Sequence, residues 1–448
     1  MKKQDQKKMG RRSFVKSSSL ATGALVLGPS MLSAKAHIDG ADVIKVGLIG
    51  CGGRGSGAAV QALSTNQNVQ LVAMADAFRD RLELSVKRIQ NEVENNDIDA
   101  TRFAVPKEHQ FDGFDGYKKV IPLCDVVIIA TPPGFRPIHF DAAIKADKHV
   151  FMEKPLAVDA PGVRKILETA KLAKQKKLNV VVGLQRHYQE KYTKWVDMLH
   201  EGVIGDITTS HVYWNSGGVW VRERKPGMTE MQYQMLNWYY FNWLCGDHIT
   251  EQHIHNLDVS NWVKKAYPIS ARGMGGRRMR TGKDHGEIFD HHFIEYQYAD
   301  GSRMMSQCRH WKGCENKVTE EFQGTNGSAP APGVILTKSG HAIMDNNGKG
   351  DPNPYQVEHD MLFAAIAKGE YKYADAENGA KSTMTSILGR MATYSGQLVT
   401  WDDAMASKLD LSPDKYDWNA NPKVMPIKDG SGMDGYYPAC IPGTTQVM

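Results

Sequence analysis

Short apolar runs alternate with amphipathic stretches through the first part of the chain. The runs are rich in β-branched residues, end at glycine, proline or polar side chains, and lie at 43–49, 69–75, 125–131, 149–152 and 179–184. Such runs are typical of strands that are buried on both faces of a parallel sheet. The stretches between them are predicted to be helices, at 77–95, 138–146 and 160–176. This alternation predicts a doubly wound α/β domain that binds ligands at the carboxyl ends of its strands.

The pattern changes after Leu184. Strands joined by turns or loops are predicted at 207–214, 269–274, 289–298, 302–310 and 318–323, and Ala299-Asp300-Gly301 is a hairpin signal between two of them. Helices are predicted at 193–200, 249–263, 355–368 and 381–396. Residues 324–354 and 419–448 are rich in glycine, proline and asparagine, and we expect loops or a packed tail there. The sequence therefore predicts a second, α+β domain with a largely antiparallel open sheet.

A glycine motif, Gly50-Cys51-Gly52-Gly53-Arg54-Gly55, directly follows the first predicted strand and opens a predicted helix. In this context G-x-G-x-x-G is the dinucleotide-binding fingerprint of a Rossmann domain. Gly50 allows the tight turn, Gly52 lets the backbone approach a pyrophosphate, and Gly55 permits close packing of the helix on the strand. The pyrophosphate lies at the helix N-terminus, where free N–H groups favour an anion. We expect Gly53 and Arg54 to contact the cofactor as well.

The second predicted strand ends at Asp76, about 20 residues beyond the glycines, as the fingerprint requires. A carboxylate there hydrogen-bonds the ribose hydroxyls and repels a 2′-phosphate, so NAD is the expected cofactor. Arg79 keeps NADP possible. Further cofactor contacts are expected from residues at the carboxyl ends of the later strands, namely Thr131, Pro132, Glu153, Lys154 and Gln185.

The N-terminal segment is predicted to be a twin-arginine export signal. Arg11-Arg12-Ser13-Phe14-Val15-Lys16 precedes a modest apolar stretch, 20–32, and Ala34-Lys35-Ala36 suits cleavage near Ala36. Because a membrane span needs about 20 apolar residues, we expect a periplasmic protein without stable membrane insertion. Removing residues 1–36 takes away eight basic residues and one acidic residue, so the formal charge falls from +5 to −2. Nothing in the remaining charge pattern favours binding of nucleic acid.

Chain length then predicts two domains, because about 400 residues exceed one comfortable core. The expected division is the signal at 1–36, an NAD-binding Rossmann domain at 42–184, a substrate-binding α+β domain at 185–418 and a tail at 419–448 packed on the domains. The six cysteines are scattered and contain no C-x-x-C, so most are expected to be free. Cys51 and Cys124 are expected to be buried, and a disulfide between Cys308 and Cys314 stays open.

Several motifs resemble, in the same order, those of the glucose-fructose oxidoreductase/inositol dehydrogenase (Gfo/Idh/MocA) family. They are the glycine loop, Ala130-Thr131-Pro132-Pro133, Glu153-Lys154-Pro155, Glu251-x-x-x-His255-x-x-Asp258 and Gly324-Thr325-Asn326-Gly327, and they span nearly the whole chain after the signal. In that family the lysine of E-K-P and a histidine from an acid-x-x-x-histidine helix flank the substrate hydroxyl beside the nicotinamide. The resemblance therefore implies that Lys154 and His255 are catalytic. Glu251 stands where aspartate is more usual, and Pro133 where many members have asparagine.

The chemistry of these residue types agrees with that role. Alcohol oxidation needs a base for the hydroxyl proton, and His255 is the preferred one because histidine titrates near neutrality. Lys154 is expected to relay the proton or to polarise the developing carbonyl. A helix over 249–263 puts Glu251, His255 and Asp258 near one face, where an acid orients the imidazole or binds substrate hydroxyls. A surface lysine and a structural histidine remain the alternatives.

Other substrate contacts are expected from Arg186 and Tyr188, just past the last Rossmann strand, and from Trp238. The aromatic run 238–243 is either core or a platform for a sugar ring. The histidine-rich run 246–255 also suggests a metal. However, His253 and His255 point to different faces of a helix, and His291-His292 point to opposite sides of a strand. The expected site therefore contains no metal ligand, and metal binding by this run stays open.

The expected function is that of a periplasmic NAD-dependent oxidoreductase that acts on a hydroxyl of a sugar or glycoside, as a homo-oligomer formed through its open sheet. Twin-arginine signals export folded proteins, and free NAD is scarce outside the cytoplasm, so we expect the cofactor to stay tightly bound. Two alternatives stay open. One is a redox-neutral, NAD-dependent glycoside hydrolase that works by oxidation, elimination, addition and reduction. The other is a non-catalytic nucleotide or sugar sensor.

Overall fold

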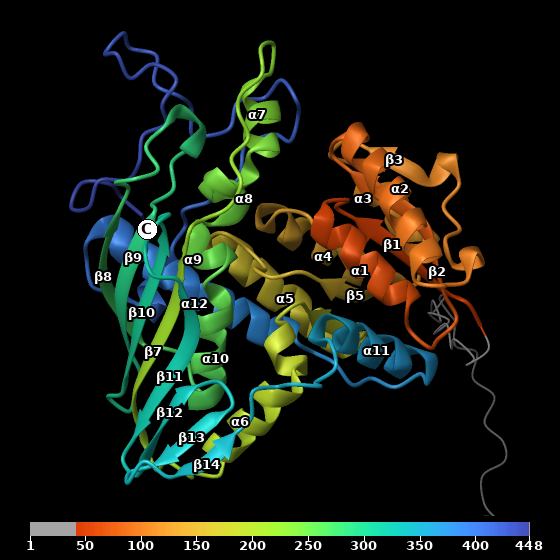
Figure 1. Cartoon of the computed structure of the whole chain (residues 1–448). Helices are drawn as coiled ribbons and strands as arrows, with labels where there is room; N and C mark the ends of the chain where they lie inside the picture. The colour runs from red at the N-terminus through yellow and green to blue at the C-terminus, as the bar shows by residue number, and fades with distance from the viewer. Residues whose placement is uncertain (1–41, 448) are drawn as a thin grey trace, which may run out of the picture. The chain divides into compact units, whose positions relative to one another are not determined.

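The computed structural model describes residues 42–447, so the predicted export signal at 1–36 lies outside the described part of the chain. Two β-sheets organise the described residues (Figure 1). The first is a six-stranded sheet with the strand order β3-β2-β1-β4-β5-β6, and all of its neighbouring strands are parallel. Its strands are β1 (Ile44–Ile49), β2 (Val69–Asp76), β3 (Gln110–Asp112), β4 (Val126–Ile129), β5 (His149–Met152) and β6 (Val180–Val182).

Five helices belong to this first sheet: α1 (Gly53–Leu63), α2 (Arg79–Asn95), α3 (Gly116–Val120), α4 (Arg136–Lys145) and α5 (Ala160–Lys176). The central strands β1 and β4 are buried almost throughout because helices cover both faces of the sheet. This explains why their sequences are continuous apolar runs rather than alternating ones. The strand order is that of a Rossmann domain. Successive strands are added toward one edge up to β3 and toward the other edge from β4 onward, and this switch between β1 and β4 leaves a crevice for a ligand.

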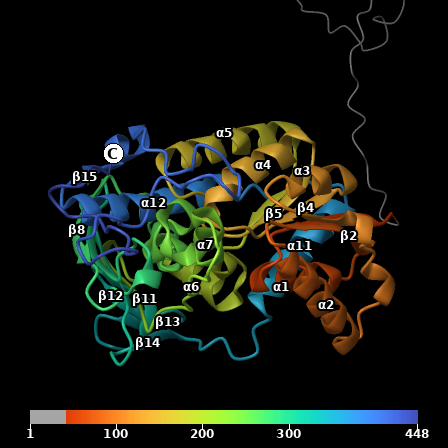
Figure 2. The ribbon, with the colours of Figure 1, turned by 90° about the horizontal axis from the view of Figure 1, so that it is seen from above.

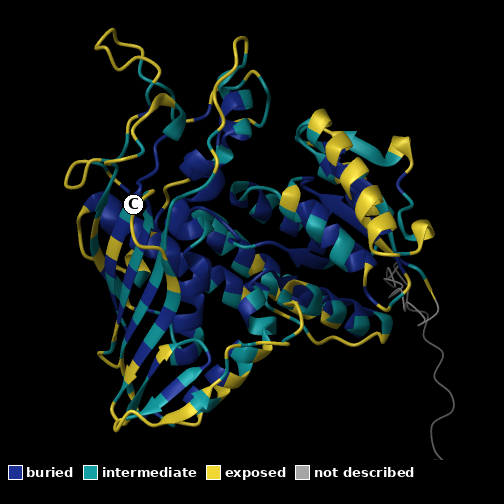
Figure 3. Cartoon of the chain, in the orientation of Figure 1, coloured by how far each residue is buried: buried dark blue, intermediate teal, exposed yellow. Residues whose placement is uncertain are grey.

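The second sheet has nine strands in the order β14-β13-β12-β11-β7-β10-β9-β8-β15. They are β7 (Ile207–Ser216), β8 (Ser270–Gly276), β9 (His291–Gln297), β10 (Arg303–His310), β11 (Lys317–Gly324), β12 (Gly327–Ala331), β13 (Val334–Thr337), β14 (Ala342–Asp345) and β15 (Val399–Thr400). Every pairing is antiparallel except that of β7 with β10. Figure 3 shows buried and exposed positions alternating along these strands, as a sheet covered on one face requires. The predicted fold class is therefore confirmed.

Residues 324–354 were expected to be loops, and here the prediction is wrong. They contain β12, β13 and β14, which are short strands that extend one edge of the second sheet. Their glycines and polar residues lack a strand-like hydrophobic period, so pairing with β11 decides their conformation rather than local propensity. The predicted hairpin at Ala299-Asp300-Gly301 is confirmed, because β9 and β10 pair directly and Gly301 has φ +85° in the turn.

The helices of the second half are α6 (Glu190–His200), α7 (Glu230–Leu236), α8 (Asn242–Cys245), α9 (His248–Glu251), α10 (Ile254–Lys264), α11 (Pro354–Ala367), α12 (Ala376–Ser395) and α13 (Trp401–Ala406). Helix α12 is almost completely buried. It packs against β8 on one side and α5 on the other, and Figure 2 shows it lying between them. Its small residues permit this, since a Cβ at Gly389 would lie 2.0 Å from the Tyr296 hydroxyl.

Helix α11 packs on the Rossmann sheet although it follows the second sheet in the chain. Leu362, Phe363 and Ile366 of α11 share a buried core with residues of β1, β2 and β4. The expected division assigned this segment to the second domain. All six cysteines lie in the described residues and are free, so the disulfide between Cys308 and Cys314 is not formed. Within residues 42–447, no helix has both the length and the apolar character that crossing a membrane requires.

Replacing Phe363 by alanine tests the position of α11. Phe363 is fully buried, so Phe363→Ala is expected to lower the free energy of unfolding by about 3–5 kcal/mol through the cavity that it leaves. Met361 of the same helix is 39% exposed, so Met361→Ala is expected to change it by less than about 0.5 kcal/mol. Urea unfolding of both variants measures the difference. Equal effects would contradict the packing of α11 in the Rossmann core.

Candidate functional site

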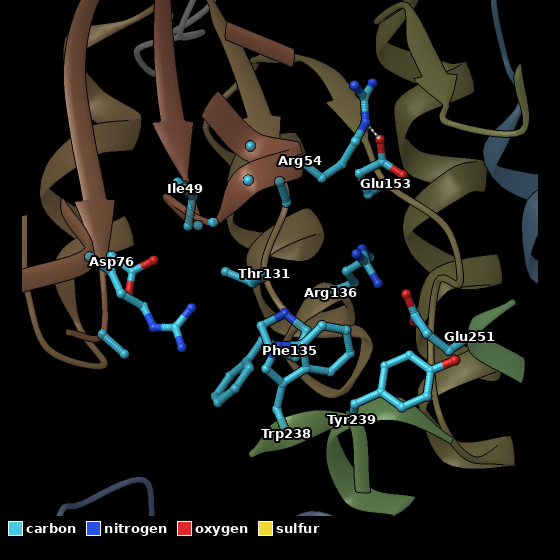
Figure 4. Close-up of a pocket in the computed structure, with 18 of the residues that line it drawn as sticks. Ile49, Arg54, Asp76, Thr131, Phe135, Arg136, Glu153, Trp238, Tyr239 and Glu251 are labelled. Atoms are coloured by element: carbon cyan, nitrogen blue, oxygen red, sulfur yellow. Dashed lines mark hydrogen bonds and ion pairs between the residues drawn. The ribbon is translucent and has the colours of Figure 1, made fainter. Parts of the chain in front are cut away.

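A cavity of about 600 Å3 lies at the carboxyl ends of the Rossmann strands and extends to α9 and α10. Figure 4 shows Asp76 at one end of this cavity and Glu251 with Tyr239 at the other. Most of the site residues expected from the sequence line it: Gly50, Gly52, Gly53, Arg54, Gly55, Asp76, Thr131, Pro132, Glu153, Lys154, Gln185, Trp238, Glu251 and His255. The cavity thus joins the expected cofactor residues to the expected catalytic residues.

The glycine loop has the geometry that a dinucleotide needs. Gly50 has φ +95°, and a Cβ there would lie 2.6 Å from the backbone nitrogen of Thr131. A Cβ at Gly55 would lie 1.9 Å from the Gly50 carbonyl oxygen, so close packing of α1 excludes a side chain. By contrast, a Cβ at Gly52 would meet nothing within 4 Å, because this glycine borders the cavity. Gly52 therefore leaves open the space in which a phosphate approaches the first N–H groups of α1.

Asp76 ends β2 beside this loop. Its Oδ2 accepts a hydrogen bond of 2.7 Å from the Cys51 N–H, and its Oδ1 accepts one of 2.9 Å from the Phe78 N–H. Burial raises the pKa of this carboxyl, and the two backbone hydrogen bonds act in the opposite direction. Arg79, the residue that kept NADP possible, turns away from the cavity to Glu83 and the Gln110 carbonyl. Arg81 lines the cavity instead.

Arg54 connects the glycine loop to two other elements. Its Nε donates to Glu153 at the end of β5, and its second nitrogen lies 3.2 Å from Glu358 Oε1 of α11. The guanidinium also lies 4.8 Å from the ring centroid of Tyr355, which lines the cavity. Burial raises the pKa of Glu358 most, and its neighbour Glu153 raises it further, so these two carboxylates depend on the shared cation. The sequence analysis did not identify Tyr355 and Glu358, because no sequence motif indicates that α11 contacts the glycine loop, which is about 300 residues away in the chain.

The middle of the cavity contains both expected and unexpected polar groups. Gln185 Oε1 is buried and has no hydrogen-bond partner among the described residues, so it is free to bind a ligand. Thr131 Oγ1 lies 3.2 Å from His139 Nδ1. Arg136 lines the same wall and donates to the Pro155 carbonyl, and burial lowers its pKa to about 10. Together with the open loop at Gly52, the unpartnered Gln185 shows that the residues present fit a dinucleotide.

The helix predicted over 249–263 is interrupted, which is a correction to the sequence analysis. Helix α9 ends at Glu251, and α10 begins at Ile254. The His255 N–H bonds the Gln252 carbonyl rather than the Glu251 carbonyl that a continuous helix would supply. The Glu251 carbonyl instead accepts a hydrogen bond from Lys154 Nζ, which also lies 3.3 Å from Glu251 Oε1. The interruption therefore provides a second acceptor for the ammonium group.

His255 lies beside this pair and lines the cavity. It is 7% exposed, its ring stacks on Trp214 at a centroid distance of 6.0 Å, and its Nδ1 has no hydrogen-bond partner in the described structure. Burial lowers its pKa well below the ordinary value, and the charges of Lys154 and Arg186 lower it further. Burial raises the pKa of Glu251, whereas Lys154 and Arg136 act in the opposite direction. The site thus combines the ammonium group of Lys154, which is paired with Glu251, and the neutral imidazole of His255.

Three expected substrate contacts do not line the cavity. Asp258 accepts hydrogen bonds from His187 at 2.7 Å and Ser382 at 2.6 Å and does not line the cavity. Arg186 is buried against Glu320. Tyr188 donates to Asp375 Oδ2 at 2.5 Å. All three side chains form hydrogen bonds or ion pairs with other residues of the protein, and sequence spacing does not reveal these partners.

The aromatic run 238–243 divides between two roles. Trp238 and Tyr239 line the cavity, whereas Tyr240, Phe241 and Trp243 are buried in a core cluster. Further aromatic and basic lining comes from residues that the sequence analysis did not select: Trp214, Trp220, Arg222 and Phe135. They lie on β7, on a following loop and in the short 3-10 turn before α4, and these positions depend on tertiary packing.

Comparisons with known proteins agree with this geometry. Residues 44–184 match the profile of GFO_IDH_MocA, described as an oxidoreductase family with an NAD-binding Rossmann fold. An inositol 2-dehydrogenase of Pseudomonas fluorescens is 32% identical over 266 residues, which are 58% of this chain and 71% of that protein. A glycosyl hydrolase family 109 protein of Shewanella baltica is 24% identical, with 94% of this chain and 84% of that protein covered. The structure of scyllo-inositol dehydrogenase from Lactobacillus casei with NAD(H) and scyllo-inositol superposes with a TM-score of 0.60 at 19% identity and covers 81% of this chain and 100% of that one.

Two alanine substitutions in the glycine loop separate cofactor contact from packing. Gly52 has φ −72°, which alanine adopts freely, so Gly52→Ala is expected to keep the melting temperature of the apoprotein but weaken NADH binding at least about tenfold. Gly55→Ala is expected to lower the melting temperature as well, because its Cβ meets the Gly50 carbonyl. Fluorescence titration with NADH and thermal unfolding provide the two readouts. Unchanged NADH affinity in Gly52→Ala would contradict the assigned phosphate position.

Proposed function

Because the chain belongs to the GFO_IDH_MocA family of NAD-binding oxidoreductases and acts on CH–OH groups, we propose that its substrate is a hydroxyl of a sugar or glycoside. The observation that carries the proposal is the contact of Lys154 with Glu251 beside an unpartnered His255, at the end of the cavity opposite Asp76. A cation and a neutral base are thereby available near the far end of a bound dinucleotide. Asp76 supports NAD over NADP, since its carboxylate repels a 2′-phosphate.

The residues at this end divide the chemistry between them. A bound NAD would supply the acceptor for the hydride that leaves the substrate carbon. The imidazole of His255 takes the hydroxyl proton, and its lowered pKa favours the neutral form that a base needs. Lys154 donates a hydrogen bond to the substrate oxygen and stabilises the carbonyl that forms. Glu251 holds the ammonium in place through its carbonyl and its carboxylate.

The walls of the cavity support a carbohydrate ligand. Trp238, Tyr239 and Trp220 form an aromatic group with centroid distances of 5.5–6.2 Å between neighbouring rings. Aromatic faces cover the apolar face of a sugar ring, and Arg222 adds a donor for its hydroxyls. The inositol 2-dehydrogenase relative acts, by its name, on a ring polyol of similar size.

Export and cofactor retention belong to the same proposal. The twin-arginine motif supports a periplasmic location, where a dissociating NAD would be lost. The contacts of Arg54 with Glu153, Glu358 and Tyr355 support slow release, because they tie α11 to the glycine loop. We also propose a homo-oligomer formed through the open face of the second sheet, where Met274 is 76% and Phe293 is 38% exposed.

A redox-neutral glycoside hydrolase is the second candidate. It is favoured by the family 109 glycosyl hydrolase relative, which aligns with 94% of this chain. In that reaction, oxidation of a ring hydroxyl acidifies the neighbouring C–H, elimination expels the aglycone, water adds, and hydride returns. The same Lys154 and His255 serve each proton transfer. A non-catalytic sensor is disfavoured by the presence of both residues.

One experiment distinguishes these functions. The protein is purified without added nucleotide, and the absorbance band of reduced nicotinamide is followed during titration with sugars, inositols and aryl glycosides. A band that appears with substrate and decays with a second carbonyl compound is the expected result for an oxidoreductase. Released aglycone without a lasting band would favour the hydrolase. Absence of both would contradict either enzyme.

The pH dependence of kcat/KM tests the base. Because the pKa of His255 is lowered, its active neutral form persists as the pH falls through the ordinary histidine pKa of about 6.5. Activity is therefore expected to stay level there and to decline only at lower pH. His255→Asn is expected to lower kcat by about 10²–10⁴-fold and to remove this acid limb. His359→Asn changes another buried histidine outside the cavity and serves as the control. An acid limb that survives in His255→Asn would assign the base elsewhere.

A further inference from the structure

A second polar cluster lies between α9 and the second sheet. Asp247 and His248 stand at the start of α9, and His292 lies on β9. Their side chains are 0–2% exposed, and one ligand atom from each lies within 4.8 Å of the other two. None of the three lines the cavity described above. The cluster therefore needs an explanation separate from substrate or cofactor contact.

His248 is the least satisfied member. It is 1% exposed, yet neither ring nitrogen has a hydrogen-bond partner among residues 42–447. A neutral imidazole always has one N–H donor and one lone pair, and burying both without partners is unfavourable. Its Nδ1 lies 3.6 Å from Asp247 Oδ1, which is too long for a hydrogen bond. Something that accepts a nitrogen lone pair would satisfy this ring.

His292 presents a second lone pair to the same place. Its Nδ1 lies 2.9 Å from Thr393 Oγ1, and that hydroxyl donates to the carbonyls of Gly389 and Arg390 at 3.1 Å. When the hydroxyl proton bonds one of these carbonyls, Thr393 accepts from the Nδ1–H of His292. The lone pair of His292 Nε2 then faces Asp247 Oδ2 at 3.3 Å. In that tautomer two acceptors face each other in a buried site, an arrangement that a cation between them would stabilise.

Asp247 has an unusual backbone for its residue type. Its φ of +72° and ψ of +162° lie in a region that glycine adopts and that other residues occupy at an energetic cost. The carboxylate lies between the two imidazoles, with Oδ1 3.6 Å from His248 Nδ1 and Oδ2 3.3 Å from His292 Nε2. The Phe289 N–H at 3.0 Å and the Tyr394 hydroxyl at 2.5 Å also donate to Oδ2 and fix its orientation. The aspartate is held by the kind of outer hydrogen bonds that orient metal ligands.

We propose that Asp247, His248 and His292 bind a divalent transition metal ion, with zinc as the expected ion. Two imidazoles and one carboxylate are a common zinc donor set, and zinc accepts a fourth ligand such as water. One ion binds a lone pair of each histidine and is attracted by the negative charge of the carboxylate. The hydrogen bond of His292 Nδ1 to Thr393 is the outer contact that metal-bound histidines usually have.

The position of the cluster indicates a structural role. The ion joins the first residues of α9 to β9, and α9 ends three residues later at Glu251, the partner of Lys154. His310 connects the same region to the cavity, because its ring lies 4.2 Å from that of His248 and its Nε2 bonds Gln252 Oε1 at 2.8 Å. The metal thus positions the segment that carries Glu251 without contacting the substrate.

Metal analysis of the full chain tests the proposal. The protein is purified without a chelating resin, dialysed, and examined by plasma mass spectrometry, which also identifies the element. About one zinc ion per chain is expected in the wild type. The double variant His248→Gln/His292→Gln is expected to lose it. His359→Gln is the matched control, because His359 is equally buried, has no hydrogen-bond partner for either nitrogen in the described residues and lies on α11.

Measurements on the wild type keep the test decisive where the double variant fails to fold. Removal of metal by a strong chelator is expected to lower the melting temperature by several degrees, and added Zn²⁺ is expected to restore it. Wild-type protein that contains no metal and whose melting temperature does not respond to Zn²⁺ would overturn the proposal, as would a folded double variant that retains the ion. In both cases a direct hydrogen bond from His292 Nε2–H to Asp247 would explain the cluster instead.

Discussion

The contact between Lys154 and Glu251 is the constraint on which the site depends. An ammonium group buried near the end of a parallel sheet is stable only if acceptors surround it, because desolvation disfavours its charge. The Rossmann domain supplies Lys154, but its acceptors come from α9, which packs against α12 and shares a buried core with β9. The helix must end at Glu251 so that its carbonyl is free, and this ending also starts α10 in the register that brings His255 into the cavity. One polar contact thereby fixes the catalytic end of the site.

The C-terminal part of the chain supports the same arrangement from two sides. Helix α12 packs between α5 and β8, so it links the layers that carry Lys154 and Glu251. Helix α11 lies on the Rossmann sheet and brings Glu358 and Tyr355 to Arg54. The glycine loop is therefore braced by a helix that is distant in sequence. The glycine loop and the segment that carries Glu251 are thus held by separate contacts from the same C-terminal region.

The sequence predicted those features that local chemistry determines. The glycine loop, the acid at the end of β2 and the burial of continuous apolar strands follow from backbone space and hydrophobic period, and they are found at the expected residues. Features that depend on tertiary contacts were missed. No glycine or proline in the sequence marks the break after Glu251. The break is stabilised instead by Lys154 of the Rossmann domain, which donates to the Glu251 carbonyl. The pairing of β12 to β14 and the partners of Arg186, Tyr188 and Asp258 likewise depend on residues far away in the chain.

The charges around His255 bear on the direction of the reaction. Lys154 is matched by Glu251, and Arg186 is matched by Glu320, yet both cations lower the pKa of the imidazole that burial already lowers. A proton taken from a substrate hydroxyl therefore makes His255 a strong acid, which readily returns the proton to a carbonyl oxygen. Such a site favours the half-reaction in which hydride and proton return to a carbonyl. Both proposed reactions need this property, because the oxidoreductase must pass its hydride to a second carbonyl compound and the hydrolase must return it to its own intermediate.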